Sequence, residues 1–121
     1  MWFSNTKRLF MRLLSVLLLM WSMTAAAHTH LTASVPADNA MLMKAPEALS
    51  LTYSAEVIML NVTVTDSKGK KVPFGFKPVT KATSEFNWTL PTLKPDTYVV
   101  NWTIVGKDGH KVQKEYSFMV H

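Results

Sequence analysis

Two histidines near the start of the chain and an Asp-Gly-His turn near its end contain residue types that bind metal ions. His28 and His30 directly follow three alanines, and Asp108 and His110 flank Gly109. A histidine at the N-terminus can offer its α-amine and an imidazole nitrogen to one ion, closing a chelate ring that no internal histidine can form. A tight turn at Gly109 would direct the Asp108 carboxylate and the His110 imidazole the same way. Together these donors predict a site for one metal ion, provided that His28 begins the mature protein.

The donor types favour Cu(II). Nitrogen and oxygen ligands without sulfur suit the tetragonal geometry of Cu(II) better than they suit Cu(I). Zn(II) can use the same ligands, but Cu(II) has the higher intrinsic affinity. Because amine and imidazole must be neutral to bind, the affinity is expected to fall on acidification.

Each of these residues also has a simpler interpretation. An Asp-Gly pair is a common hairpin turn, and His110 alone would be an ordinary exposed turn residue. The tripeptide from His28 to His30 could bind Cu(II) without any fold, through its amine, two backbone amides and the His30 imidazole. We prefer the folded site because no amide proton has to be removed there.

The condition on His28 is supported by a secretion-signal pattern. A positive region with three cations is followed by an apolar run over residues 13–21 and by small residues, with Ala25 and Ala27 at positions −3 and −1. Cleavage after Ala27 is favoured, and cleavage after Ala26 is the alternative. The apolar run is short for a membrane span, so a membrane anchor is the second interpretation. We therefore expect a signal peptide over residues 1–27 and a mature domain over residues 28–121.

The composition narrows the class of protein. Removing residues 1–27 from the 121 leaves 94 residues, which suits one domain with a single core. The formal charge of +5 includes the three signal cations, so the mature charge of +2 gives no indication of nucleic-acid binding. The chain has no cysteine, which excludes disulfides and thiolate ligands.

Short segments of alternating apolar and polar residues predict an all-β fold. The expected strands are 31–35, 49–53, 60–64, 72–79, 86–90, 97–105 and 112–120. The segment 72–79 is the weakest, because Pro73 and Pro78 interrupt it and favour an edge position. About seven strands, regularly spaced turns and no amphipathic helix predict an antiparallel β-sandwich whose core is rich in aromatic residues, including Trp88 and Trp102.

Several motifs resemble the CopC family of periplasmic copper-binding proteins. They are the His-Thr-His-Leu segment at 28–31, the Pro-Ala-Asp turn at 36–38, the Lys-Pro-Asp-Thr-Tyr turn at 94–98, Trp102, and the Asp-Gly-His turn at 108–110. The resemblance covers essentially the whole mature chain. It implies a Greek-key, immunoglobulin-like β-sandwich with a Cu(II) site made by His28, Asp108 and His110, and with His30 as an additional ligand.

The resemblance also implies a role in periplasmic copper tolerance or supply, alongside a CopD-type inner-membrane copper transporter. Three departures stand out. Asp96 replaces the usual Gly of the Lys-Pro-Gly-Thr-Tyr turn. Glu56 lies one place later than the Glu of the family pattern, which puts its role near the metal in doubt. The Met-rich loop that binds Cu(I) in some members is missing.

The methionines of the mature chain show no motif of their own. Met41 and Met43 are neighbours in sequence, whereas Met59 and Met119 fall in expected strands. No spacing gathers three of them with a histidine, so core packing is favoured over a Cu(I) site. His121 is expected to be a solvated end.

We expect a monomeric carrier or buffer of one Cu(II) ion, and no enzyme. Two alternatives stay open. Copper monooxygenases also bind copper through an N-terminal histidine, although they need an open copper position and a broad substrate surface. An immunoglobulin-like adhesion module, in which the histidines are incidental, is the second alternative.

Overall fold

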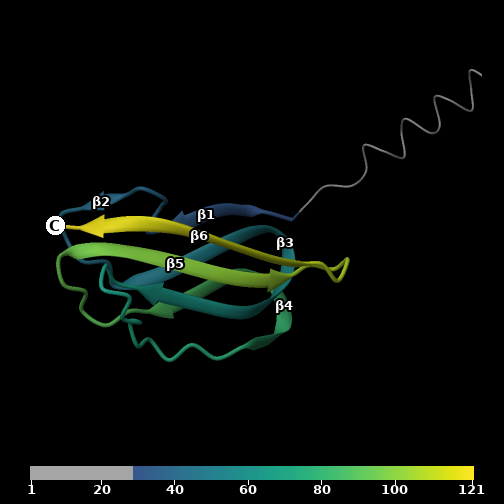
Figure 1. Ribbon diagram of the computed structural model, residues 1–121. Helices are drawn as coiled ribbons and strands as arrows, with labels where there is room; N and C mark the ends of the chain where they lie inside the picture. The colour runs from purple at the N-terminus through teal and green to yellow at the C-terminus, as the bar shows by residue number, and fades with distance from the viewer. Residues whose placement is uncertain (1–28) are drawn as a thin grey trace, which may run out of the picture.

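The computed structural model describes residues 29–121, so the expected signal peptide and His28 lie outside the described residues. This part of the chain is built from strands and loops (Figure 1). Its six strands are β1 (Leu31–Val35), β2 (Met41–Leu42), β3 (Ala48–Thr65), β4 (Val79–Thr89), β5 (Asp96–Val105) and β6 (Lys111–Val120). No helix long and apolar enough to cross a membrane is found between residues 29 and 121.

Strand β3 holds the two layers of the fold together. Its first half lies between β1 and β4, with Leu51 opposite both Ser34 and Phe86. Its second half pairs with β5, from Ile58 opposite Val105 to Thr65 opposite Val99. Strands β5, β6 and β2 follow in that order. The all-β, Greek-key sandwich expected from the sequence is therefore confirmed, and only the short β2–β6 pair is parallel.

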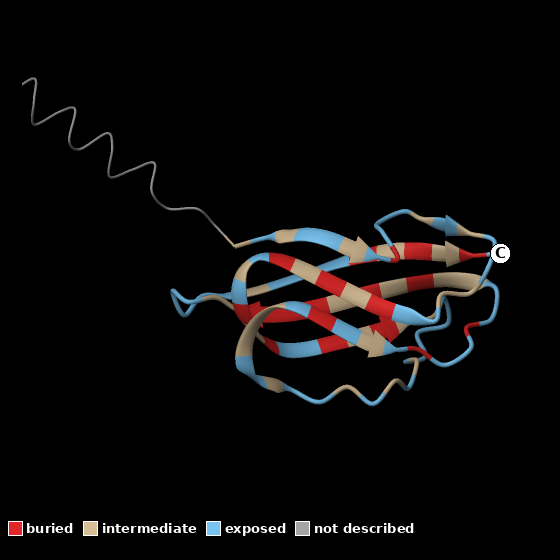
Figure 2. Cartoon of the chain, turned by 180° about the vertical axis from the view of Figure 1, so that it is seen from behind, coloured by how far each residue is buried: buried red, intermediate tan, exposed pale blue. Residues whose placement is uncertain are grey.

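The core lies between the two layers, where the alternating side chains of β3, β5 and β6 meet (Figure 2). Trp102 is 3% exposed, and its ring lies 5.2 Å from that of Tyr53 in an edge-to-face arrangement. Phe118 is 1% exposed and stacks on Tyr98. Such aromatic pairs stabilise a core beyond their buried area, by about 0.5–1.5 kcal/mol each. The expected aromatic core is present.

The expected strand over residues 72–79 is wrong. Residues 72–78 form no strand, and β4 begins only at Val79. Pro73 and Pro78 have no backbone N–H for a strand ladder, and Gly75 has a φ of +71° that a strand does not accept. The segment instead packs Phe74 and Phe76 against the half-buried ring of Trp88.

Two further differences concern strand boundaries. The expected strands 49–53 and 60–64 are parts of the single strand β3, whose pairing with β4 shifts register between Thr52 and Met59. In β1, a register shift between Leu31 and Ala33 interrupts the expected alternation, and Val35 is 61% exposed. A bulge adds a residue without ending the strand. The sequence pattern then looks like two separate strands, or assigns exposed residues to the buried face.

Candidate metal centre

The turn between β5 and β6 is closed by its own backbone. The Gly109 N–H donates to the Gly106 carbonyl at 3.0 Å, and the Gly106 N–H donates to the His110 carbonyl at 3.2 Å. Gly109 has a φ of +80°, a left-handed conformation that glycine adopts without steric cost. The turn therefore holds Asp108 and His110 at fixed places on either side of Gly109.

Asp108 and His110 lie on the same side of the turn and form a hydrogen-bonded pair. The Asp108 Oδ1 atom accepts the backbone N–H of His110 at 3.0 Å, and Oδ2 lies 2.8 Å from the His110 Nδ1 atom. The backbone hydrogen bond from His110, followed by that from its ring, lowers the pKa of the Asp108 carboxyl. Because an ionised carboxylate only accepts, Nδ1 carries a proton, and in the neutral form of the ring Nε2 keeps its lone pair. A neutral imidazole held in this tautomer is the arrangement found in many histidine ligands to metals.

A small hollow lies beside this pair. Its volume is about 190 Å³, and it is lined by Thr29, Ile104, Gly106, Asp108, His110 and Val112. A Cβ atom at Gly106 would lie 3.1 Å from the Asp108 Oδ1 atom and 3.7 Å from the Thr29 Oγ1 atom. The missing side chain at Gly106 therefore lets the start of the chain and the Asp108 carboxylate approach each other.

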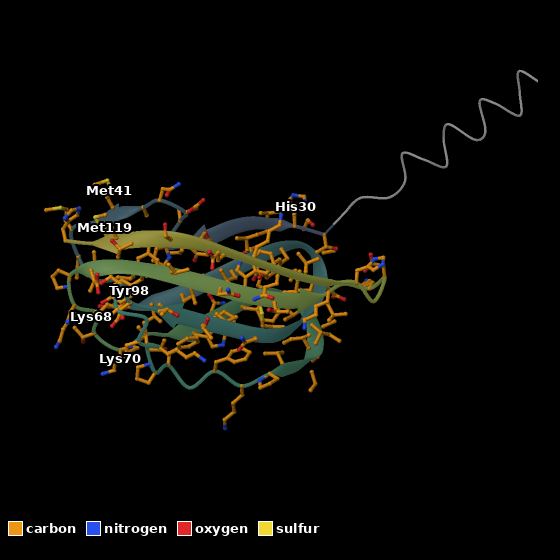
Figure 3. The ribbon with its side chains drawn as sticks, in the orientation of Figure 1. His30, Met41, Lys68, Lys70, Tyr98 and Met119 are labelled. Atoms are coloured by element: carbon orange, nitrogen blue, oxygen red, sulfur yellow. The ribbon has the colours of Figure 1, made fainter. Side chains whose placement is uncertain are left out.

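His30 lies beside β3 and does not approach the Asp108–His110 pair. Its backbone is fixed to β3, because its N–H donates to the Ser54 hydroxyl at 3.0 Å and its carbonyl accepts the Ser54 N–H at 2.9 Å. Figure 3 shows the His30 side chain above β1, away from the β5–β6 turn, and His30 does not line the hollow. Thr29, whose side chain reaches the hollow, is a contact that the sequence analysis missed.

Glu56, which is displaced by one position from the Glu of the family pattern, also lies near the β5–β6 turn. Its carboxylate lies 3.8 Å from the Lys107 ammonium, and both side chains are exposed. An exposed pair of this kind contributes little to stability. The contact nevertheless brings a second carboxyl group to the turn that carries Asp108.

A larger hollow, of about 710 Å³, lies at the opposite end and offers no comparable donors. It is lined by residues of the turns 66–73 and 91–96, with lysines at its rim. Its two carboxylates are engaged: Asp66 accepts the N–H groups of Lys68 and Lys70, and Asp96 accepts that of Thr97. Hydrogen bonds from Ser67, and then from Thr97, lower the pKa of Asp96.

The Asp108–His110 pair thus contributes two of the four donors that the sequence analysis expected. Between residues 29 and 121, no three side chains of His, Cys, Asp or Glu gather closely enough to hold a metal ion. Asp108 and His110 are a carboxylate and an imidazole, which fit Cu(II), and both are open to solvent. The remaining two expected donors belong to His28, which precedes Thr29 at the edge of the hollow.

The chain is similar to several known proteins. The CopC domain matches residues 31–121. The protein YobA of Escherichia coli (strain K12) is 32% identical over 111 residues, which cover 78% of this chain and 79% of YobA. The copper resistance protein C of Xanthomonas campestris pv. juglandis is 29% identical over 109 residues, which cover 82% of this chain and 84% of that protein. The crystal structure of CopC from Methylosinus trichosporium OB3b has a TM-score of 0.65 at 27% identity, over 77% of this chain and 93% of that chain.

Proposed function

Because this chain belongs to the CopC family, we propose that it binds one Cu(II) ion at the β5–β6 turn and serves as a copper carrier or buffer, not as an enzyme. The observation that supports this proposal is the Asp108–His110 pair. Its carboxylate and imidazole are joined by a 2.8 Å contact on a turn that the backbone closes. The turn keeps the two donors next to each other, and a turn of the His110 ring would let the metal replace the contact between them.

The proposed ligands are the His28 amine, the His28 imidazole, His110 and Asp108. Nε2 lies on the far side of the His110 ring from Asp108, so the contact between Nδ1 and Oδ2 must open before both residues can bind the same ion. His28 is bonded to Thr29, whose side chain lines the hollow, and neighbouring Cα atoms are about 3.8 Å apart. The amine of a chain that begins at His28 is therefore within reach of the turn. His30 is proposed as an additional ligand only where the chain's start rearranges.

The exposure of the pair suits a carrier. The side chains of His110 and Asp108 are 82% and 62% exposed. A partner protein can therefore approach both donors directly. We place the mature protein in the periplasm, after removal of residues 1–27, as a monomer that exchanges copper with a CopD-type transporter of the inner membrane.

The test is a competitive Cu(II) titration of protein exported to and processed in a periplasm, with its N-terminus verified by mass spectrometry. His110→Ala is expected to lower the affinity about a hundredfold or more, because one ligand is lost and Asp108 loses its contact with the ring. His121→Ala is the matched control and should leave the affinity unchanged. An extra alanine before His28 should weaken binding by more than about tenfold, because the amine is then displaced from the chelate ring.

Other outcomes would replace the proposal. Unchanged affinity in His110→Ala would assign copper to the tripeptide from His28 to His30 alone. Weak Cu(II) binding by correctly processed wild-type protein would favour the alternative of an adhesion module that binds no metal. Sustained oxygen consumption by the copper-loaded protein, with a reductant and a polysaccharide, would favour the monooxygenase.

A further inference from the structure

Strands β2 and β6 bring two distant segments side by side at the end of the molecule opposite the β5–β6 turn (Figure 1). Met41 is paired with Met119, and Leu42 with Val120. The Met119 N–H donates to the Ala40 carbonyl, and the His121 N–H to the Leu42 carbonyl, each at 2.8 Å. These two bonds fix the register of the pair, so that Met43 is the neighbour of His121.

The inward and outward sides of this pair are clear from burial. Val120 is 4% exposed in the core, and Leu42 packs against the core. Residues on either side of an inward position in a strand point outward. Met41 and Met43 are accordingly 69% and 84% exposed. Met119 is half-buried and His121 is exposed, on the outward side of β6.

Three thioethers and one imidazole therefore share one outward surface, which we call the methionine corner: Met41, Met43, Met119 and His121. Neighbouring strands are about 4.8 Å apart, and residues i and i+2 of a strand about 6.6 Å apart. Met41 and Met119 thus start from neighbouring strands, and Met43 and His121 each follow the last residue of one of these strands. Figure 3 shows Met41 and Met119 next to each other at this end. Both line a hollow of about 260 Å³.

We propose that the methionine corner is a second metal site, and that it takes a soft monovalent ion, Cu(I) or Ag(I). Thioether sulfur is a soft ligand that selects Cu(I), and imidazole also binds copper. Each methionine has three rotatable bonds, so three sulfurs can converge on one ion without a change in the backbone. Two strongly exposed methionines side by side gain nothing from the hydrophobic effect, whereas a metal site gives them a role.

This site is independent of the proposed Cu(II) site. The two lie at opposite ends of β6, whose ten residues span roughly 30 Å. It also differs from a Met-rich loop, because its ligands come from two paired segments that are distant in the sequence. Neither Asp108 nor His110 contributes to it.

The experiment is a titration of mature protein with Ag(I), followed by NMR of the methionine methyl groups. The methyl groups of Met41, Met43 and Met119 should shift together at one equivalent. Met59 is fully buried and serves as the internal control, whose signal should stay in place. The double variant Met41→Leu, Met119→Leu should lose at least about tenfold in Ag(I) affinity while remaining folded, since leucine is close to methionine in volume.

His110→Ala, measured in the same way, separates the two proposals. It should keep the three methyl shifts and the Ag(I) affinity of the corner, whatever it does to Cu(II). The inference is overturned if Ag(I) moves none of the three signals, if Met59 moves as much as they do, or if the double variant keeps the wild-type affinity. An anaerobic Cu(I) competition should reproduce the Ag(I) result, and failure to do so would remove copper as the ion.

Discussion

Strand β6 presents a different kind of surface at each of its ends. At its start, a carboxylate and an imidazole two residues apart are joined by hydrogen bonds across a single turn. At its finish, thioethers from two distant segments meet through a short parallel pair. The first surface is arranged by local backbone geometry, and the second by how the whole chain folds back on itself.

This difference affects which ion each end would hold. The donors of the turn are oxygen and nitrogen, held in place before binding. Those of the methionine corner are three flexible sulfurs and one nitrogen. Oxygen and nitrogen donors fit Cu(II), and thioethers fit Cu(I). A change of pH should therefore affect metal binding mainly at the turn. A change from Cu(II) to a softer ion should favour binding at the methionine corner.

Acidification is expected to separate the two ends most strongly. Between pH 7.5 and pH 5, Cu(II) affinity at the turn should fall by about a thousandfold or more, because α-amines and imidazoles ordinarily titrate near 7.7–8.0 and 6.5. The Asp108 carboxylate does not take part in this fall. Hydrogen bonds lower its pKa, so it stays ionised over the whole range and is neutralised only as the pH drops through that lowered value.

Ag(I) at the methionine corner should fall by less than about tenfold over the same range, because thioethers bind no proton there and the imidazole is one donor of four. Competition titrations of both ions at the two pH values measure the contrast. A parallel fall at both ends would mean that the corner depends on its imidazole, or that Ag(I) is bound elsewhere.

Asp108→Asn is expected to have the next largest effect. The amide cannot replace both acceptor oxygens, so His110 loses its orientation and Cu(II) affinity should drop about tenfold to a hundredfold. Asp96→Asn is the matched control, because Asp96 also accepts backbone N–H groups but lies at the other end. Ag(I) affinity should stay the same in both variants. An equal loss of Cu(II) in the control would point to general destabilisation.

Two glycines give the smallest and most local contrast. Gly109 and Gly69 both have a φ of +80°, and a Cβ atom added at either position would have no neighbouring atom within 4 Å. Alanine at either site should cost about 1–2 kcal/mol of unfolding free energy, measured in urea, because the left-handed conformation is strained for any residue with a Cβ atom. Only Gly109→Ala should also weaken Cu(II) binding, by a few-fold.

The sequence predicted the elements whose signals are local. Strands β5 and β6 alternate regularly, with Tyr98, Trp102 and Phe118 facing inward. The Asp-Gly turn between them is a strong hairpin signal, and the structure places the Asp108 carboxylate beside the His110 ring on this turn. The contributions of His28 and His30 to a metal site stay predictions, since His28 lies outside the described residues.

The missed features depend on distant parts of the chain. The apolar residues of the loop 72–78 predicted a strand, but Phe74 and Phe76 pack against the ring of Trp88 without forming one. The two residues of β2 are too few to show any period, so neither their pairing with β6 nor the meeting of Met41 and Met119 could be read from spacing.

The length of β3 has a consequence for how the protein reaches its native state. The strand has eighteen residues, and it pairs with segments that lie both before and after it in the chain. Residues 58–65 pair along almost their whole length with 99–105, so during synthesis from the N-terminus this layer cannot close until β5 has followed. Until then the apolar side chains of β3 face water. A topology of such non-local pairs folds slowly, and its intermediates expose an unpaired edge to aggregation.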